Sequence, residues 1–224
     1  MTLSFTENRK PKTENPKIKL RIFLTGVGGQ GTLLASRVLG EAALEAGFSP
    51  LVSETHGMAQ RGGIVVSTVV LGEVKSPIIS PGEADVLLGF EALETFRALD
   101  RCHARSLVIA NTAAIPPYPV ATGQAQYPPV SHLLQLMGEH VGGLLAFDAG
   151  DRARQAGSAL AVNMVLLGAL AATACLPFSQ EDLLHILRTR TNPKFLEANL
   201  NAFQAGVDAA QDSQNWVRRP ASWH

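Results

Sequence analysis

Three glycines, Gly26, Gly28 and Gly31, stand between an apolar run and a stretch with helical periodicity. At this spacing, Gly26 would allow a tight turn, Gly28 would let a phosphate approach the backbone, and Gly31 would allow close helix packing. The start of the helix offers unpaired N–H groups and a partial positive charge to an anion. With Gly29 and Gln30, these residues predict a loop that binds a phosphate-bearing ligand.

The same spacing matches the dinucleotide fingerprint, so nicotinamide binding is an alternative. The acid that would bind an adenine ribose could only be Glu54, which lies farther along than the usual ~20 residues. A Walker-type loop is disfavoured because no Lys-Ser/Thr pair follows Gly31. A third alternative is purely structural, with the glycines serving only a tight turn from strand to helix.

A second glycine cluster, SETHGMAQRGG, combines three glycines with Arg61 and His56. We expect it at the carboxyl end of the second strand, the edge where doubly wound sheets bind ligands. Arg61 could hold a phosphate or carboxylate with two parallel hydrogen bonds, or it could be a surface ion pair. His56 is more simply a solvated or packed imidazole than a catalytic group. The candidate ligand site therefore gains Glu54, Arg61, Gly62 and Gly63, and we predict no catalytic residue.

Several short apolar segments predict strands, and helical patterns separate most of them. The strand segments are Ile18–Val27, SPLVSE, IVVSTVVLG, ADVLLGF, SLVIANT and GGLLAFDAG. This alternation predicts an α/β fold, a Rossmann-like doubly wound and mostly parallel sheet with C-terminal helices. A segment with five prolines in 19 residues, AAIPPYPVATGQAQYPPVS, interrupts the pattern and predicts a functional or interface loop.

The C-terminal part predicts helices, one capped by Ser179 and one by Asn192 with Pro193 in its first turn. The helix over Ala159–Leu176 is apolar around its whole circumference. We expect a buried helix rather than a membrane span, because small residues contribute little transfer energy and the segment contains Asn163, Gly168 and Thr173. A surface helix would keep a polar face, so we expect the sheet to cover one side and a partner subunit the other.

The composition limits the classes of function. The chain has 224 residues, 46% of them hydrophobic, with 19 basic and 19 acidic side chains, so no net field attracts nucleic acid or an anionic membrane. Cys102 and Cys175 are too few for a disulfide framework, a four-cysteine zinc site or an iron–sulfur cluster. We predict no metal site and a cytoplasmic location, with a disordered arm (1–17), one domain (18–211) and a tail (212–224).

Four blocks, in order, resemble the gamma-type domain of the 2-oxoacid:ferredoxin oxidoreductases, most closely the small subunits of the indolepyruvate enzymes. The blocks are GVGGQGTLLASRVLGEAALEAG, ETHGMAQRGG, SPIISPGEADVLLGFEALE and AVNMVLLGAL, and the resemblance covers Ile18 to Ala210. The family pattern Glu-x-x-Gly-x-x-x-Arg-Gly-Gly falls on Glu54, Gly57, Arg61, Gly62 and Gly63. A second pattern, Asn-x-x-Ala-Phe-x-x-Gly, falls on Asn199, Ala202, Phe203 and Gly206.

The complete enzymes of this family decarboxylate a 2-oxoacid oxidatively with coenzyme A, giving an acyl-CoA and reduced ferredoxin. The resemblance implies a heteromeric complex in which a large partner subunit carries thiamine diphosphate and the iron–sulfur clusters. This chain would lack a redox centre, present its glycine loops to the pyrophosphate of coenzyme A and meet a phosphate with Arg61. The implied substrate is indolepyruvate or another aryl 2-oxoacid. A stand-alone NAD-binding dehydrogenase and a noncatalytic nucleotide- or CoA-binding module remain alternatives, and the isolated chain could form a homo-oligomer.

Overall fold

The protein is built around one seven-stranded sheet in the order β2-β3-β1-β4-β5-β6-β7. The computed structural model describes residues 18–56, 63–116, 120 and 122–220. The strands are β1 (Leu20–Val27), β2 (Leu51–His56), β3 (Ile64–Leu71), β4 (Ala84–Gly89), β5 (Cys102–Asn111), β6 (Gly143–Phe147) and β7 (Trp216–Arg218). Only β3 and β7 run against the other five strands. The predicted α/β fold with a mostly parallel sheet is confirmed.

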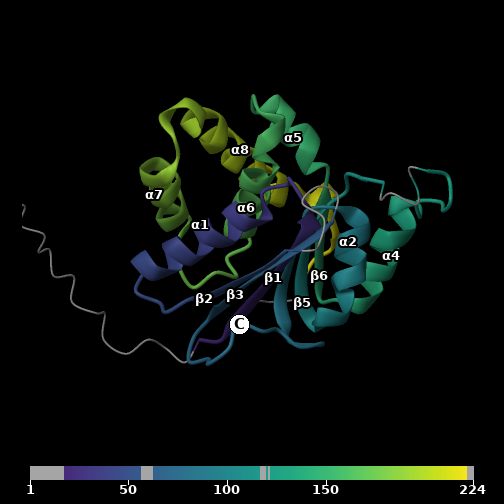
Figure 1. Cartoon of the computed structure of the whole chain (residues 1–224), viewed down its shortest axis with the longest axis horizontal. Helices are drawn as coiled ribbons and strands as arrows, with labels where there is room; N and C mark the ends of the chain where they lie inside the picture. Colours follow the sequence, from purple (N-terminus) through teal and green to yellow (C-terminus); the bar gives the residue numbers. More distant parts are fainter. Residues whose placement is uncertain (1–17, 57–62, 117–119, 121, 221–224) are drawn as a thin grey trace, which may run out of the picture.

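Helices cover both faces of the sheet (Figure 1). One face carries α1 (Thr32–Glu45), α5 (Ala149–Gln155), α6 (Val162–Ala172), α7 (Gln180–Arg190) and α8 (Pro193–Gln211), and the other carries α2 (Ala92–Arg97) and α4 (Val130–His140). Neighbouring residues of β1 therefore enter different cores, Leu24 beneath the five-helix layer and Phe23 beneath α2 and α4. Because both faces are covered, β4, β5 and β6 are almost continuously apolar.

The chain reverses its direction of travel across the sheet between β1 and β4. From β1 it passes through α1 to β2 on one side, and from β4 it continues to β5 and β6 on the other. The antiparallel β3 fills the place between β2 and β1, and its first residue, Ile64, pairs with Val27 at the end of β1. The first glycine loop and the described ends of the second cluster, His56 and Gly63, therefore lie at one edge of the sheet, beside the topological switch point where such folds bind ligands.

The apolar segment Ala159–Leu176 forms a short 3-10 turn, η2 (Ala159–Ala161), followed by α6. Every residue from Asn163 to Leu170 is buried within this single chain. The sheet lies on one side of α6 and α8 packs antiparallel on another, so our expectation that a partner subunit must cover this helix is wrong. Within the described residues, no helix is both long and apolar enough to cross a membrane.

The two predicted helix caps are confirmed. The Ser179 hydroxyl accepts a hydrogen bond from the Asp182 amide while the Asp182 carboxylate accepts one from the Ser179 amide, which is a capping box. Asn192 caps α8, and Pro193 occupies its first turn.

The C-terminal segment takes part in the sheet. We expected a tail over 212–224, but residues 213–215 form the 3-10 turn η3 and β7 then pairs with β6. Trp216 donates a hydrogen bond from Nε1 to the Ala210 carbonyl at 2.8 Å, and Arg218 donates one to the Gly138 carbonyl at 2.9 Å. These contacts fix the segment across α8 and α4. The predicted disordered arm, residues 1–17, lies outside the described residues.

Candidate functional site: the glycine loop and the start of α1

Two glycines of the first loop adopt conformations that favour glycine. Gly31, the N-cap residue of α1, has φ 80° and Gly29 has φ 99°. A Cβ on Gly31 would lie 2.6 Å from Nδ2 of Asn163 on α6, whereas a Cβ on Gly29 would meet open space. Gly31 therefore lets α1 start close to α6, as predicted, while Gly29 supplies a left-handed turn facing outward.

Gly26 has another role than we expected. Gly26 lies inside β1, where a Cβ would be 2.7 Å from Cβ of Phe90, so it permits close packing rather than a turn. The Gly28 amide donates a hydrogen bond to the Gly63 carbonyl at 2.9 Å. This bond joins the first glycine loop to the last residue of the second cluster, and it means that the Gly28 N–H is already paired.

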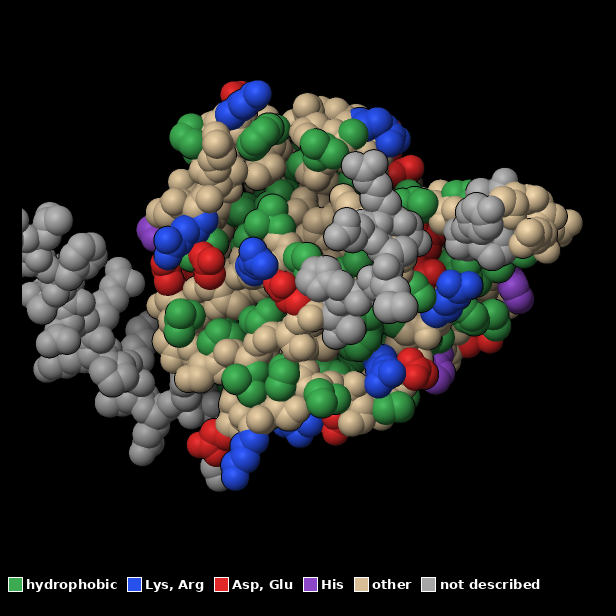
Figure 2. All heavy atoms as spheres, viewed as in Figure 1, with side chains coloured by type: hydrophobic (Ala, Val, Ile, Leu, Met, Phe, Trp, Pro, Cys, Tyr) green, Lys and Arg blue, Asp and Glu red, His purple; other side chains and the backbone are tan. Residues whose placement is uncertain are grey.

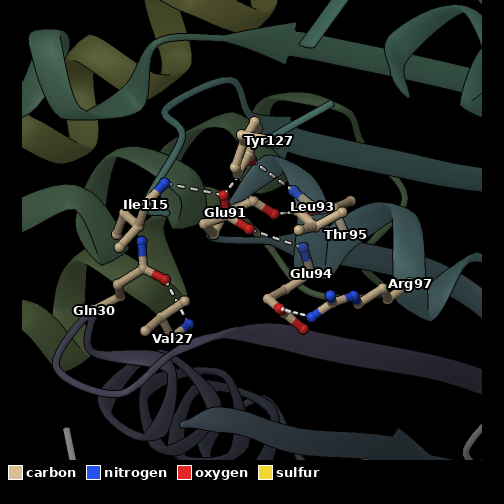
Figure 3. Close-up of polar contacts among 9 residues, drawn as sticks. All are labelled: Val27, Gln30, Glu91, Leu93, Glu94, Thr95, Arg97, Ile115 and Tyr127. Carbon is tan, nitrogen blue, oxygen red and sulfur yellow. Dashed lines mark hydrogen bonds and ion pairs between the residues drawn. The ribbon is translucent and has the colours of Figure 1, made fainter. Parts of the chain in front are cut away.

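Gln30 uses its side-chain amide to shape the loop. Its Oε1 accepts a hydrogen bond from the Val27 amide at 2.7 Å, and its Nε2 donates one to the Phe90 carbonyl, also at 2.7 Å. The Phe90 carbonyl accepts a second hydrogen bond from Asn111 at 2.9 Å. Gln30 thus fastens the glycine loop to Phe90, which follows β4, and both ends of its amide are occupied. Figure 3 shows the bond that Gln30 accepts from the Val27 amide.

A buried carboxylate, Glu91, lies beside this point (Figure 3). It caps α2 by accepting a hydrogen bond from the Glu94 amide, and it also accepts hydrogen bonds from the Ile115 amide and the Tyr127 hydroxyl. Burial, reinforced by the neighbouring Glu91 carboxylate, raises the pKa of Tyr127 above its usual value. Glu91 therefore anchors both ends of the Pro-rich connection, which we predicted as a functional or interface loop, to the start of α2.

A cavity of about 430 Å³ opens beside the start of α1. It is lined by Val27, Gly28, Gly29, Gly31, Thr32, Leu33, Leu34, Arg37 and Val65. No side chain caps this end of α1. Thr32 is 2% exposed, and its hydroxyl oxygen is buried without a hydrogen-bond partner among the residues that the structure describes. The cavity thus combines the unpaired N–H groups of a helix start with an apolar wall, which suits an anion attached to an apolar group.

Glu54 is already engaged at the rim of this cavity. Its carboxylate accepts hydrogen bonds from Nε and Nη2 of Arg37 on α1, at 3.1 and 3.3 Å. Because β3 lies between β1 and β2, Glu54 is two strand spacings, roughly 9–10 Å, from β1. In the dinucleotide fold the acidic residue stands on the strand next to β1, so this arrangement argues against ribose binding by Glu54.

Sequence reasoning missed Arg37 and Thr32. Both follow the glycine loop on α1, but their importance depends on the cavity and on the pairing with Glu54, neither of which the local sequence reveals. Of the second cluster, residues 53–56 and Gly63 belong to the described residues, whereas Arg61 and Gly62 lie outside them. The structure therefore brings Gly28, Gly29 and Gly31 to the cavity and Glu54 to its rim, while Gln30 and Gly26 support the loop.

The charged side chains on one face of the molecule form small groups of mixed sign. On the face drawn in Figure 2, basic and acidic side chains alternate in small groups, and no large area carries one sign. This distribution agrees with the equal numbers of basic and acidic residues.

The two cysteines lie away from the glycine loops. Cys102 begins β5 at the opposite edge of the sheet, and Cys175 follows α6. Burial raises the pKa of the Cys102 thiol to about 12 and that of Cys175 to about 11, so both are protonated near neutral pH. A thiolate is the form that binds metals and attacks electrophiles, which makes both thiols unreactive. Across the described part of the chain, no cluster of three His, Cys, Asp or Glu side chains is placed to hold a metal.

Comparison with known proteins decides the family. The pyruvate ferredoxin/flavodoxin oxidoreductase family matches residues 21–209. The chain belongs to this family. Members with similar sequences include the indolepyruvate oxidoreductase subunit IorB of Methanothermobacter thermautotrophicus, 42% identical over 192 residues that cover 86% of this chain and 98% of the relative. The IorB subunit of Pyrococcus horikoshii is 41% identical over 196 residues, covering 87% and 97%.

Solved structures of this oxidoreductase family share the fold. The gamma subunit of a keto/oxoacid ferredoxin oxidoreductase from Geobacter sulfurreducens has a TM-score of 0.63 at 24% identity, covering 86% of this chain and 98% of the other. The 2-oxoglutarate:ferredoxin oxidoreductase of Magnetococcus marinus has a TM-score of 0.67 at 21% identity, and the match covers 93% of this chain but 34% of that longer chain. The resemblance inferred from the sequence blocks is confirmed.

The structure also explains the second family pattern. Phe203 and Gly206 lie on α8 where it crosses α6, and a Cβ on Gly206 would stand 1.8 Å from the Val165 carbonyl oxygen. Only glycine lets the two backbones approach so closely. This pattern therefore serves the packing of α8 against α6.

Proposed function

We propose that this chain is the small subunit of a 2-oxoacid:ferredoxin oxidoreductase and that its glycine-loop cavity binds coenzyme A. The observation that carries the proposal is the uncapped start of α1, which opens onto a cavity that Thr32 lines, with the unpartnered Thr32 hydroxyl buried directly behind this surface. Family membership and the IorB relatives support it, and they favour indolepyruvate or another aryl 2-oxoacid as the substrate of the complex. The Magnetococcus marinus enzyme is described with 2-oxoglutarate, coenzyme A and succinyl-CoA bound, which makes CoA a reasonable ligand to test here.

In this proposal the chain binds and orients CoA rather than carrying out the oxidation. The amides in the first turn of α1 and the Thr32 hydroxyl would donate hydrogen bonds to the pyrophosphate of CoA, and Arg61 would meet a phosphate. The apolar wall of Val27, Leu33 and Val65 would exclude water from the ligand. Thiamine diphosphate and iron–sulfur clusters, which supply the decarboxylation and electron transfer, would be held by a large partner subunit. The two protonated thiols of this chain fit that division of roles.

Thr32→Val provides a sharp test of CoA binding. Valine has nearly the same shape and replaces a hydroxyl that has no described partner, so the free energy of unfolding should not fall, while the affinity for CoA should. Ser67→Ala is the matched control, because the Ser67 hydroxyl on β3 is also buried and unpartnered but does not line the cavity. Isothermal titration calorimetry of the full chain with CoA measures the difference.

The competing functions have distinct outcomes. If the chain binds NAD and not CoA, the dehydrogenase alternative is correct, despite the position of Glu54. If Thr32→Val and Ser67→Ala bind CoA as tightly as the unchanged chain does, the cavity is not the site. We also expect no oxidation of a 2-oxoacid by the isolated chain with CoA and a dye acceptor. Turnover should require co-expression of a large thiamine-diphosphate subunit, and turnover without it would refute the assignment as a subunit.

A further inference from the structure

Arg37 lies at the rim of the cavity but away from the start of α1. It follows Thr32 by five residues, which is about 7–8 Å along the helix axis. Leu33, Leu34 and Arg37 are spaced three and four residues apart, so they share one face of α1, and all three line the cavity. An anion held at the start of α1 and an anion held by Arg37 would therefore occupy two separate positions on the same side of the cavity.

The guanidinium of Arg37 is partly free. Its Nε and Nη2 contact Glu54, whereas the described part of the chain shows no hydrogen-bond partner for Nη1. The side chain is 65% exposed, and an exposed ion pair contributes little to stability. A phosphate could accept hydrogen bonds from Nη1, or displace Glu54 and accept two, without a large loss elsewhere. Glu54 meanwhile holds the guanidinium against the rim of the cavity.

The surface between these two positions is apolar. Leu34 is a large hydrophobic side chain that is 48% exposed on the first turn of α1, and Val65 at the start of β3 lines the same cavity. A ligand that fits would carry two phosphate groups separated by roughly one sugar, together with a flat or apolar part that covers these side chains. The 3′-phosphate 5′-diphosphate of an adenosine has this arrangement, whereas NAD and simple nucleotides lack the second phosphate position.

We propose that Arg37 is the specificity residue for the 3′-phosphate of coenzyme A, with the start of α1 holding the diphosphate. This inference rests on the proposed CoA site. Arg37 would distinguish CoA from 3′-dephospho-CoA, which is identical except for that phosphate. Glu54 would orient the arginine and repel anions weakly, and it would not bind the ribose.

The test compares two ligands against matched variants of the full chain. Calorimetry with CoA and with 3′-dephospho-CoA should show about tenfold or more tighter binding of CoA by the unchanged chain, as expected for a charge-assisted hydrogen bond to phosphate. Arg37→Gln should remove this preference by weakening CoA alone. Arg190→Gln is the control, because Arg190 is 67% exposed and also pairs with a glutamate of α1, Glu41, but does not line the cavity. It should keep the full preference.

A further variant tests whether Glu54 orients Arg37 or binds the ligand itself. Glu54→Gln should bind CoA at least as tightly as the unchanged chain, because the repelling carboxylate is gone. If it weakens CoA and 3′-dephospho-CoA equally and strongly, Glu54 binds the ribose and the proposal is wrong. Equal affinity of the unchanged chain for both compounds, or equal weakening of both by Arg37→Gln, would overturn the role of Arg37 while leaving a CoA site in place. Failure of the unchanged chain to bind either compound would instead overturn the proposed function.

Discussion

The contact between α6 and α8 makes a strong prediction about stability. A Cβ on Gly206 would lie 1.8 Å from the Val165 carbonyl oxygen, and a Cβ on Gly168 would lie 1.9 Å from the Phe203 carbonyl oxygen. Because real Cβ atoms essentially never come within 3.0 Å of another heavy atom, Gly206→Ala must push the helices apart by about 1.2 Å. The obstructing atoms are backbone, so no side-chain rotation can relieve the clash.

Two opposing effects set the size of the change. Alanine is better than glycine inside a helix by about 1 kcal/mol. Forcing extra volume into a packed core costs about 1–3 kcal/mol, and more where the surroundings cannot move. Since this contact joins two backbones, we expect the clash to exceed the helix preference, with a net loss of about 2 kcal/mol or more. For a chain of this size that loss lowers the melting temperature by roughly 4–8 °C.

Urea unfolding followed by circular dichroism gives the free energy, and Gly138→Ala is the matched control. Gly138 lies within α4, where a Cβ would make an ordinary contact of 3.5 Å with Val217, so alanine there should stabilise the protein by up to about 1 kcal/mol. Both substitutions replace glycine with alanine inside a helix, yet they should change the free energy of unfolding in opposite directions. If Gly206→Ala is as stable as the unchanged chain, or if both variants shift in the same direction by the same amount, the close helix contact is wrong.

Three other predictions follow from buried groups. Gln30→Glu replaces the donor to the Phe90 carbonyl with an acceptor, so it should cost about 1–3 kcal/mol in urea unfolding and weaken CoA binding in calorimetry; no change in either would show that Gln30 does not shape the loop. Leu166→Asp places a charge at a site with no exposure inside this chain, so the variant should fail to fold even when a large subunit is co-expressed, and rescue by that subunit would restore the idea of a partner-covered helix. The raised pKa of the Cys102 thiol means that the unfolded chain loses this proton at a lower pH than the folded chain, so the free energy of unfolding should fall from about pH 9 towards pH 12. Cys102→Ala should make this fall shallower, and an unchanged dependence on pH would contradict the raised pKa of Cys102.

The elements of this fold could be predicted from the sequence because their causes are local. The capping box at Ser179 and the proline after Asn192 mark helix starts within four residues of sequence. The apolar runs of β4, β5 and β6 predicted buried parallel strands for the same reason. The order of the strands could not be predicted from local sequence patterns, because the insertion of β3 between β2 and β1 depends on pairing between segments that are distant in the sequence.

The details of the site depend on contacts between residues that are far apart in the sequence. Gln30 in a glycine loop suggests a ligand contact, but its partner is the Phe90 carbonyl, 60 residues away. The apolar circumference of the Ala159–Leu176 segment correctly indicated cover on several sides, yet it could not tell that α8 of the same chain provides it. Pairing of Arg37 with Glu54 depends on the register of β2 beneath α1, which no motif records.

The strand β7 also keeps β6 from pairing with another copy of the chain. An open sheet presents unpaired N–H and C=O groups at its last strand, and another chain can add to them. Here β6 is buried along its whole length, and without β7 it would be the edge strand of the sheet. The strand β7 is only three residues long, and Pro220, which follows it and packs near Gly143, cannot donate a ladder hydrogen bond. Trimming residues 212–220 would therefore make the apolar β6 the edge strand, which is prone to pair with another chain and aggregate.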